Sequence, residues 1–433
     1  MFINLQTPAE IVLLILGLAV FGLAAWQRLD WGAALVLFCA PLYLLKIKVG
    51  WLPLSVLEVL ILIILGIWLV RRTSQRENPP QPPFFKGGRR GDFWFLSILL
   101  ILVGAVLSTI FSADLKVSAG IFKSWILEPM IFGFLLVDVI QTKKQLARAL
   151  LALILSGLAV AVIGLGYLLA GRLTFDGRLA AFYLSPNHLA MYLAPAFILA
   201  LGFWFWAKKL WQTILLVICY MLYVICLYFT YSYAAWLALF VSLFFALFFL
   251  GRYKIVGGKK LFIVYCLLFI VLLTATWSQL GSEKLGNLLT SERSSWQSRL
   301  MVWQAALKIG QDHWLVGIGP GLFQKYYLDY QKYFPVPYLE WAAPQPSNLF
   351  LAFWLQTGLV GLIGFLWLLV NFFRWTIGAV KKTKQPLVLI LMAVMIYFLA
   401  HGLVDTTYWK NDLALIFWVV IALSYAAGLL KRE

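Results

Sequence analysis

The sequence predicts an all-α integral membrane protein that crosses the bilayer many times. Of its 433 residues, 63% are hydrophobic and only 12% are charged, and the mean hydropathy is +0.90. Soluble proteins carry about a quarter charged residues, so this composition excludes a soluble globular protein. Apolar runs of roughly 20 residues, the length that a membrane-crossing helix needs, recur along the whole chain. The alternation of apolar and polar residues that marks a β-barrel is not seen.

The apolar runs predict about 12–13 transmembrane helices in a single polytopic domain over residues 1–433. The number of helices is given as a range for two reasons. The first two apolar runs are short, and the run at 118–139 contains the charged residues Lys123, Glu128 and Asp138. No basic segment precedes the first run, so we expect that run to stay in the protein. The predicted spans are residues 9–25, 31–45, 52–70, 93–111, 118–139, 145–170, 187–206, 212–230, 232–250, 261–280, 347–373, 386–404 and 412–430.

Basic residues predict the orientation because they cluster between the spans. The clusters are Arg71, Arg72, Arg76, Lys86, Arg89 and Arg90, then Lys143, Lys144 and Arg148, then Lys208 and Lys209, then Arg252, Lys254, Lys259 and Lys260, then Arg374, Lys381, Lys382 and Lys384, and finally Lys431 and Arg432. The predicted spans place them all on one side, which the positive-inside rule assigns to the cytoplasm. Lys46 and Lys48 are the exception. Residues 71–92, rich in Pro, Gly and charge, are expected to be a flexible cytoplasmic loop.

Several partners are not expected from this sequence. The net charge of +18 follows from the loop clusters, so it does not indicate nucleic acid. The cysteines lie inside apolar runs without a CxxC spacing or a neighbouring histidine, which predicts neither a disulfide nor a metal site. These residues are Cys39, Cys219, Cys226 and Cys266.

Residues 281–346 form the long loop on the predicted outer side. A connection of this length is usually functional. Ser294 and Ser295 are candidate N-caps. An apolar stripe at helical spacing follows them and predicts an amphipathic helix of about four turns in the membrane interface, ending near Gly310. The stripe consists of Trp296, Leu300, Trp303 and Leu307.

The second half of this loop contains a glycine-rich turn at residues 317–321 and then a run of aromatic residues that includes Tyr326. Two interpretations of the run are open. The aromatic side chains can form a belt at the membrane interface, or they can stack on sugar rings.

Four stretches resemble the O-antigen ligase and polymerase superfamily. They are RLAAFYLSPNHLAMYLAP (178–195), RSSWQSRLMVWQAALKIGQDHWLVGIGPGLF (293–323), PSNLFLAFWLQTGLVGLIGF (346–365) and HGLVDTTYWKNDLALIFW (401–418). Their order and their positions relative to the spans also match. The resemblance covers roughly residues 90–430.

The resemblance implies transfer of a glycan from a polyprenyl-pyrophosphate carrier to an acceptor hydroxyl on a sugar, a lipid A core or a protein. It implies no cofactor and no metal. It places the chain in a bacterial cytoplasmic (inner) membrane, with the large loop outside, the C-terminus in the cytoplasm and membrane lipids around it. The oligomeric state is left open.

The family holds the pyrophosphate with arginines on the outer side, and the sequence offers candidates. Guanidinium groups suit a diphosphate because they bind its oxygens in pairs. Arg178 and Arg299 lie beside predicted membrane boundaries, and Arg172 and Arg293 are weaker candidates. We expect these groups to converge on one anion-binding cavity. The alternative is that they reach the phosphates of ordinary lipids.

Two positions depart from the family pattern. The family commonly has His-Asn where this chain has Ser347-Asn348, and serine is no general base near neutral pH without help. A Ser-Arg-Gly motif is replaced by Ser232-Tyr233-Ala234. We assign Ser347, Asn348, Asn187 and Tyr326 to the acceptor and glycan region.

The replacement at Ser347 leaves the catalytic base unassigned among three histidines. His188 lies at the outer end of a span, and His313 lies in the large loop. His401 has Asp405 four residues on, so the carboxylate can orient its ring. The alternative for this pair is a purely structural hydrogen bond.

Three functions therefore remain open. The first is a glycosyltransferase of surface polysaccharide assembly, and the second is a non-catalytic member that binds a lipid-linked glycan. The third is a transporter of small solutes, of the inorganic-carbon type. Against the transporter, the chain shows no internal repeat, and Glu58, deep in a span, has no partner apparent in the sequence.

Overall fold

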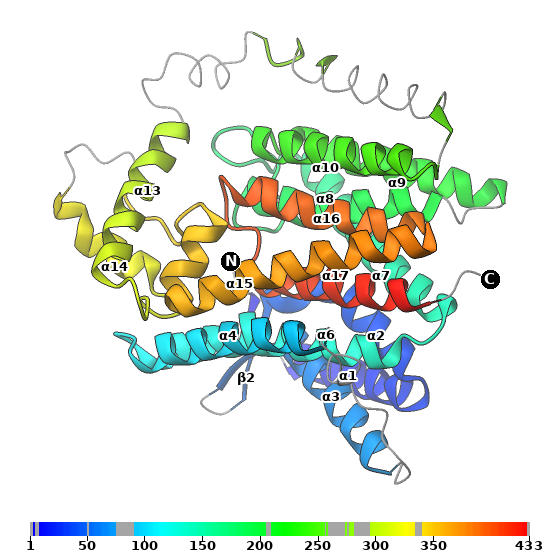
Figure 1. Cartoon of the computed structure of the whole chain (residues 1–433), viewed down its shortest axis with the longest axis horizontal. Helices are drawn as coiled ribbons and strands as arrows, with labels where there is room; N and C mark the ends of the chain where they lie inside the picture. The colour runs from blue at the N-terminus through cyan, green and yellow to red at the C-terminus, as the bar shows by residue number, and fades with distance from the viewer. Residues whose placement is uncertain are drawn as a thin grey trace.

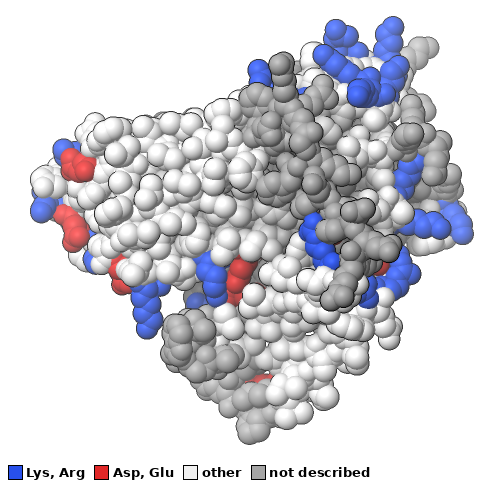
Figure 2. Space-filling view, turned by 60° about the horizontal axis from the view of Figure 1, so that its bottom comes forward, with Lys and Arg blue, Asp and Glu red and all other residues white. Residues whose placement is uncertain are grey.

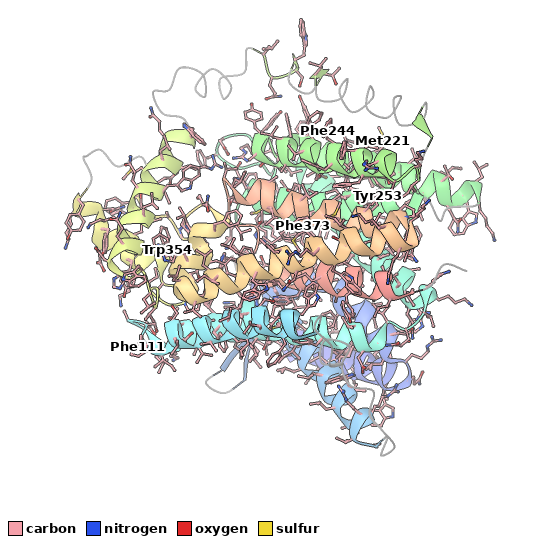
Figure 3. All side chains as sticks on the ribbon, in the orientation of Figure 1. Phe111, Met221, Phe244, Tyr253, Trp354 and Phe373 are labelled. Carbon is pink, nitrogen blue, oxygen red and sulfur yellow. The ribbon has the colours of Figure 1, made fainter. Side chains whose placement is uncertain are left out.

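The computed structural model is almost entirely helical, which confirms the predicted fold class. It describes residues 3–4, 8–49, 52–74, 91–204, 209–255, 257–258, 273–274, 277–280, 295–333 and 340–430. Long helices lie side by side in a bundle, and α13 and α14 cover one end of it (Figure 1). Large apolar side chains such as Phe111 and Met221 are 70% and 59% exposed on its outside (Figure 3). Such a surface suits lipid rather than water.

The bundle helices follow the predicted spans within a few residues in most places. They are α1 (Pro8–Gln27), α2 (Leu29–Phe38), α3 (Val56–Ser74), α4 (Gly91–Ile110), α5 (Leu115–Phe122), α6 (Glu128–Val139), α7 (Lys143–Leu169), α8 (Pro186–Trp204), α9 (Leu210–Phe229), α10 (Tyr233–Arg252), α15 (Leu349–Thr383), α16 (Pro386–Gly402) and α17 (Asn411–Leu429). In the described ranges, 7 helices are long and apolar enough to cross a membrane, and further apolar helices are shorter. Most of the predicted span 261–280 and of the loop 71–92 lies outside the described residues.

The predicted span 31–45 is wrong in its second half. Helix α2 ends at Phe38 and is followed by a 3₁₀ turn, η1 (Ala40–Leu44). A small sheet of order β1-β2-β3 then joins β1 (Ile3–Asn4), β2 (Leu45–Val49) and β3 (Leu52–Ser55). β2 and β3 form an antiparallel hairpin, so the next helix begins only at Val56. Strands this short leave almost no periodic signal in a sequence.

A π-helical turn, η2 (Lys123–Leu127), joins α5 to α6 and brings Lys123 and Glu128 together. An α-helix of 3.6 residues per turn directs side chains five residues apart to different faces, whereas a π turn aligns them. The Lys123 ammonium lies 3.8 Å from a Glu128 carboxylate oxygen and 3.4 Å from one of Glu58. The partner of Glu58 that the sequence did not reveal is therefore Lys123.

Helices α4 and α15 pack backbone against backbone through glycines. A Cβ atom at Gly104 would lie 2.4 Å from the Gly361 nitrogen, and one at Gly364 would lie 2.7 Å from the Ile101 nitrogen. Small residues allow this approach in membrane helix pairs. Further toward its start, α15 is interrupted at Gly358, whose φ is +67°.

The large loop folds as α13 (Ser295–Asp312), α14 (Phe323–Tyr330) and a 3₁₀ turn, η3 (Gln331–Tyr333), around a small core of its own. The predicted helix is confirmed. Trp296, Leu300 and Leu307 of its stripe are exposed, while the face that packs inward is formed by Val302, Ala305, Ala306 and Ile309.

The glycine-rich turn fixes this loop to the bundle. Gly317, Gly319 and Gly321 all have positive φ. The Ile318 amide donates to the Leu355 carbonyl at 2.7 Å, and the Gly319 amide donates to the Ser108 hydroxyl at 2.9 Å. The α13–α14 hairpin is therefore held on the ends of α4 and α15.

Candidate functional site

Arg178 is presented by a tight turn between α7 and α8. Gly177, with φ +70°, lets the chain turn back so that the Arg178 amide donates to the Thr174 hydroxyl at 3.1 Å. The next amide, of Leu179, donates to the Phe229 carbonyl at 2.8 Å. The turn is thus fixed to the end of α9.

The Arg178 guanidinium is held by three groups. Its Nε donates to the Thr230 carbonyl at 2.7 Å, and its Nη2 donates to the Asn187 side-chain oxygen at 2.7 Å. The Asp176 carboxylate lies 3.7 Å from Nη1. The side chain is 15% exposed, so these groups and their neighbours enclose most of it.

A second arginine, Arg299, lies close enough to Arg178 to act on it electrostatically. The Asn187 amide nitrogen donates to the Asp405 carboxylate at 2.9 Å, and the Arg299 Nε donates to the Val404 carbonyl at 2.7 Å. Arg299 thus binds the turn after α16 directly, and Arg178, far from it in sequence, is linked to Asp405 of the same turn through Asn187.

The start of α15 closes this arrangement. Asn348 caps the helix by accepting from two backbone amides, and its own nitrogen donates to the Leu403 carbonyl at 2.8 Å. Ser347 has a φ of +48°, and its carbonyl accepts from the Trp303 indole of α13 at 3.1 Å. Asn348 and Asn187 therefore contact the same turn after α16 as Arg299, and Ser347 precedes Asn348. We call these side chains, together with Arg178 and Asp405, the arginine site.

Three cations, Arg178, Arg299 and Lys410, lie at this site among three carboxylates, those of Asp176, Asp405 and Asp412. Burial lowers the pKa of Arg178, and the nearby Arg299 lowers it further, while Asp176 and Asp405 raise it. Lys410, on the loop between α16 and α17, also has its pKa lowered by burial, against the opposite effect of Asp412 and Asp405. Arg178 and Arg299 are thus close enough to act on each other electrostatically, and carboxylates offset part of their charge.

The expected His401–Asp405 pair is not formed. The Asp405 carboxylate is taken by the Asn187 side chain and the Thr406 amide, and the His401 Nδ1 lies 2.9 Å from the Tyr397 hydroxyl instead. The reason is that α16 ends at Gly402, so Asp405 is no longer on the helix that carries the histidine.

The other histidines lie elsewhere. His188 is buried, and its Nε2 lies 3.2 Å from the Asp412 carboxylate. His313 packs edge-on against Tyr326, with ring centroids 5.1 Å apart, within the α13–α14 hairpin. None of the three rings belongs to the hydrogen bonds that hold Arg178, although Arg299 acts electrostatically on His401.

The structure does not bring Arg172, a further candidate, into the hydrogen bonds of this site. Arg172 is exposed, and its side chain has no hydrogen bond to the described residues. Arg293 lies outside the described ranges. Tyr233, which stands where the family has an arginine, donates to the Gln279 side chain at 3.1 Å.

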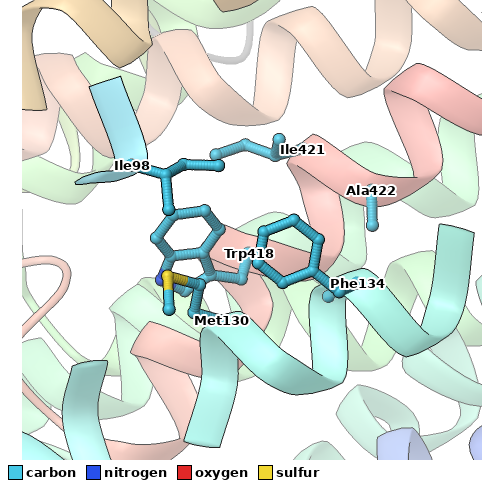
Figure 4. A pocket seen from close by; sticks show the side chains of 7 residues that line it. Ile98, Met130, Phe134, Trp418, Ile421 and Ala422 are labelled. Atoms are coloured by element: carbon cyan, nitrogen blue, oxygen red, sulfur yellow. The ribbon is translucent and has the colours of Figure 1, made fainter. Parts of the chain in front are cut away.

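A small cavity between α4, α6 and α17 does not belong to this site (Figure 4). It is about the size of one water molecule, and it is lined by Ile98, Met130, Gly133, Phe134, Trp418, Ile421 and Ala422. Such an apolar lining does not suit phosphate. The single anion-binding cavity expected from the sequence stays a prediction.

Three contacts in and around the site were not predicted from the sequence. Thr230 contributes only its carbonyl, and backbone groups carry no sequence signal. Trp303 was expected on the membrane-facing stripe, yet its indole reaches Ser347. Tyr397 stands one helical turn before His401, and that spacing alone could have drawn attention to it.

Comparison with known families gives one match that bears on this arrangement. The sequence model of the family described as O-antigen ligase matches residues 218–366 of this chain. This segment includes Thr230, Arg299, Ser347 and Asn348. No curated protein matches the chain.

Proposed function

Since residues 218–366 match the O-antigen ligase family, consistent with the superfamily that the sequence resembles, we propose that the chain is a membrane glycosyltransferase. It takes a glycan from a polyprenyl-pyrophosphate carrier and transfers it to an acceptor hydroxyl at the outer face of a bacterial cytoplasmic membrane. The reaction belongs to the assembly of surface polysaccharides such as lipopolysaccharide, with undecaprenyl pyrophosphate as the expected carrier.

The observation that supports this proposal most is the meeting of Arg178 and Arg299 at the turn after α16. The leaving group of the reaction is a lipid-linked pyrophosphate. Its negative charge grows as the bond to the sugar breaks, and fixed guanidinium groups stabilise that charge most where water is excluded. Asn187 and Asp405 hold Arg178 in place for this task.

The distribution of charge supports the orientation. Lys and Arg gather at the right-hand end of the molecule in Figure 2, whereas α13 and α14 lie at the left-hand end in Figure 1. The positive-inside rule then assigns α13, α14 and the arginine site to the outer face.

Replacing the two arginines tests the proposal. In membranes supplied with a purified polyprenyl-pyrophosphate-linked glycan and an acceptor glycan, Arg299→Ala and Arg178→Ala are each expected to lower transfer tenfold to a hundredfold. A hydrogen bond between charged partners contributes about 1.5–3 kcal/mol, which corresponds to this range. Lysine at either position should restore only part of the loss, since an ammonium cannot bind two phosphate oxygens side by side.

Arg172→Ala is the matched control, because this arginine belongs to the same loop as Arg178 and is exposed. It should transfer glycan at the normal rate. Equal activity of all three variants would refute the role of the arginine site. Binding of the donor without transfer would instead indicate a non-catalytic member of the family, and solute uptake into proteoliposomes would indicate a transporter.

A further inference from the structure

Two arginines from different helices share one buried carboxylate near the start of α7, whereas the turn that carries Arg178 follows the other end of this helix. Arg28, between α1 and α2, donates to Asp30 through Nε at 3.3 Å and through Nη2 at 3.2 Å. Arg148, in the second turn of α7, pairs with the same carboxylate. The Asp30 side chain is only 8% exposed. One carboxylate thus holds two guanidinium groups in place and compensates only one of their charges.

Two exposed tryptophans border these arginines. The Arg148 guanidinium carbon lies 4.3 Å from the centroid of the Trp31 ring. Arg71, in the last turn of α3, donates to the Trp26 carbonyl. The Trp31 and Trp26 side chains are 48% and 53% exposed. Indole rings are typical of the headgroup level of a bilayer, and a guanidinium stacked on an indole keeps its N–H groups in plane for oxygen acceptors.

The positive charge continues across the neighbouring helix ends. The Arg72 guanidinium carbon lies 5.0 Å from the Trp68 ring centroid, and the Trp68 indole donates to the Asp138 carboxylate of α6 at 2.7 Å. Six cations thus stand against two carboxylates, an excess of the sign that attracts anionic headgroups. We call this group, with Trp26 and Trp31, the Arg–Trp cluster; its charged members are Arg28, Arg71, Arg72, Lys143, Lys144 and Arg148 with Asp30 and Asp138.

An exposed apolar stripe on α1 leads away from the Arg–Trp cluster. Leu23, Val20 and Leu16 are 65%, 67% and 57% exposed, and they continue from Trp26 at steps of three or four residues. Residues at this spacing lie on one face of a helix. This face therefore runs from an indole at the charged end along the apolar length of α1, which suits an acyl chain whose headgroup lies on the arginines.

We propose that the Arg–Trp cluster binds the headgroup of an anionic phospholipid of the cytoplasmic leaflet, with an acyl chain along the exposed stripe of α1. The inference is independent of the transfer reaction and uses only the orientation that the basic loops predict. The lipid phosphate takes charge-assisted hydrogen bonds from Arg28, Arg71 and Arg148. A zwitterionic headgroup brings its own cation next to these arginines, so it binds less tightly.

Native mass spectrometry of the full chain in a non-ionic detergent tests this selectivity. Phosphatidylglycerol is expected to bind about tenfold more tightly than phosphatidylcholine with the same acyl chains. The preference should shrink in about 0.5 M ammonium acetate, where charges are screened within a few ångström. Equal affinity for the two lipids would overturn the assignment. Glycerol 3-phosphate, which has no acyl chain, should not displace the bound lipid; if it does, the cluster binds free phosphate compounds and is no lipid site.

Variants then locate the binding. Arg28→Gln/Arg71→Gln removes two cations while Arg148 still pairs with Asp30, and it should weaken the binding of phosphatidylglycerol about tenfold. Trp26→Ala should weaken it by a smaller factor, since the charge is kept and only the apolar contact is lost.

Lys381→Gln/Lys382→Gln is the matched control, because it removes two exposed cations from the last turn of α15, on the same predicted side of the membrane. It should bind phosphatidylglycerol as the wild type does. Equal weakening by the two double variants would assign the effect to the overall surface charge and overturn the site. The comparison of lipids on the unmodified chain stands whether or not every variant folds.

Discussion

Gly104→Leu should leave almost no folded protein in the membrane. A Cβ atom at this position would lie 2.4 Å from the Gly361 nitrogen and 2.6 Å from the Thr357 carbonyl oxygen. These are backbone atoms of α15, so no rotation of a side chain relieves the overlap. Over-packing of a core costs about 1–3 kcal/mol, and the separation of two whole helices exceeds this. We expect the apparent melting temperature in detergent to fall by on the order of 10 °C or more.

Gly166→Leu provides the comparison, because Gly166 is also in a membrane-length helix and a Cβ there meets nothing within 4 Å. Its yield and melting temperature should match the wild type. The packing of α4 on α15 would be wrong as described if Gly104→Leu were extracted as a monodisperse protein of normal stability. We also expect Gly104→Leu to disrupt the arginine site. The large loop that carries Arg299 is fixed to α4 and α15 through Ser108 and Leu355, so separating these helices displaces it.

Lys123→Met should produce the second largest effect. Glu58 and Glu128 are 6% and 5% exposed, and Lys123 is the cation beside both of them. Removing one partner from a buried ion pair destabilises a protein by about 3–5 kcal/mol. Proton uptake by a carboxyl group reduces this value, so we expect a loss toward the lower end, measured as a lower melting temperature in detergent.

The double variant Lys123→Met/Glu58→Gln should recover most of that stability, because the cation and the carboxylate nearest to it then disappear together. Lys116→Met is the matched control: Lys116 is exposed and lies on α5, the helix that leads into the π turn. If Lys123→Met were as stable as Lys116→Met, the ion pairs of Lys123 with Glu58 and Glu128 would contribute nothing to the stability of the fold.

The sequence predicted much of this structure because the bilayer imposes simple requirements. The predicted span 145–170 is found as Lys143–Leu169, and the helix expected after Ser294 and Ser295 is found as Ser295–Asp312. Hydrophobic length and 3.6-residue periodicity are local properties of a chain. The same approach failed at residues 31–45, where a short apolar run continues into a strand rather than across the membrane.

The spacing of residues along the chain also failed to predict the contact at the π turn, between Lys123 and Glu128. In an ordinary helix Lys123 and Glu128 would point in different directions, so their pairing could not be expected from the sequence. Glu58 joins them from another helix, at a separation of 65 residues from Lys123. A contact of this kind depends on how the helices pack against one another.

His401 is the clearest example of a contact that the tertiary structure decides and the sequence does not. Tyr397 and Asp405 are each four residues from His401, so by spacing alone they are equivalent partners. The sequence by itself determined that this is a many-spanning helical membrane protein with arginines near its outer boundary, because hydrophobic length and charge are written residue by residue. Only the tertiary structure decided that α16 ends at Gly402, which directs Asp405 to Asn187 and leaves His401 to Tyr397. The choice of partner depends on packing between segments distant in sequence, and no local pattern records it.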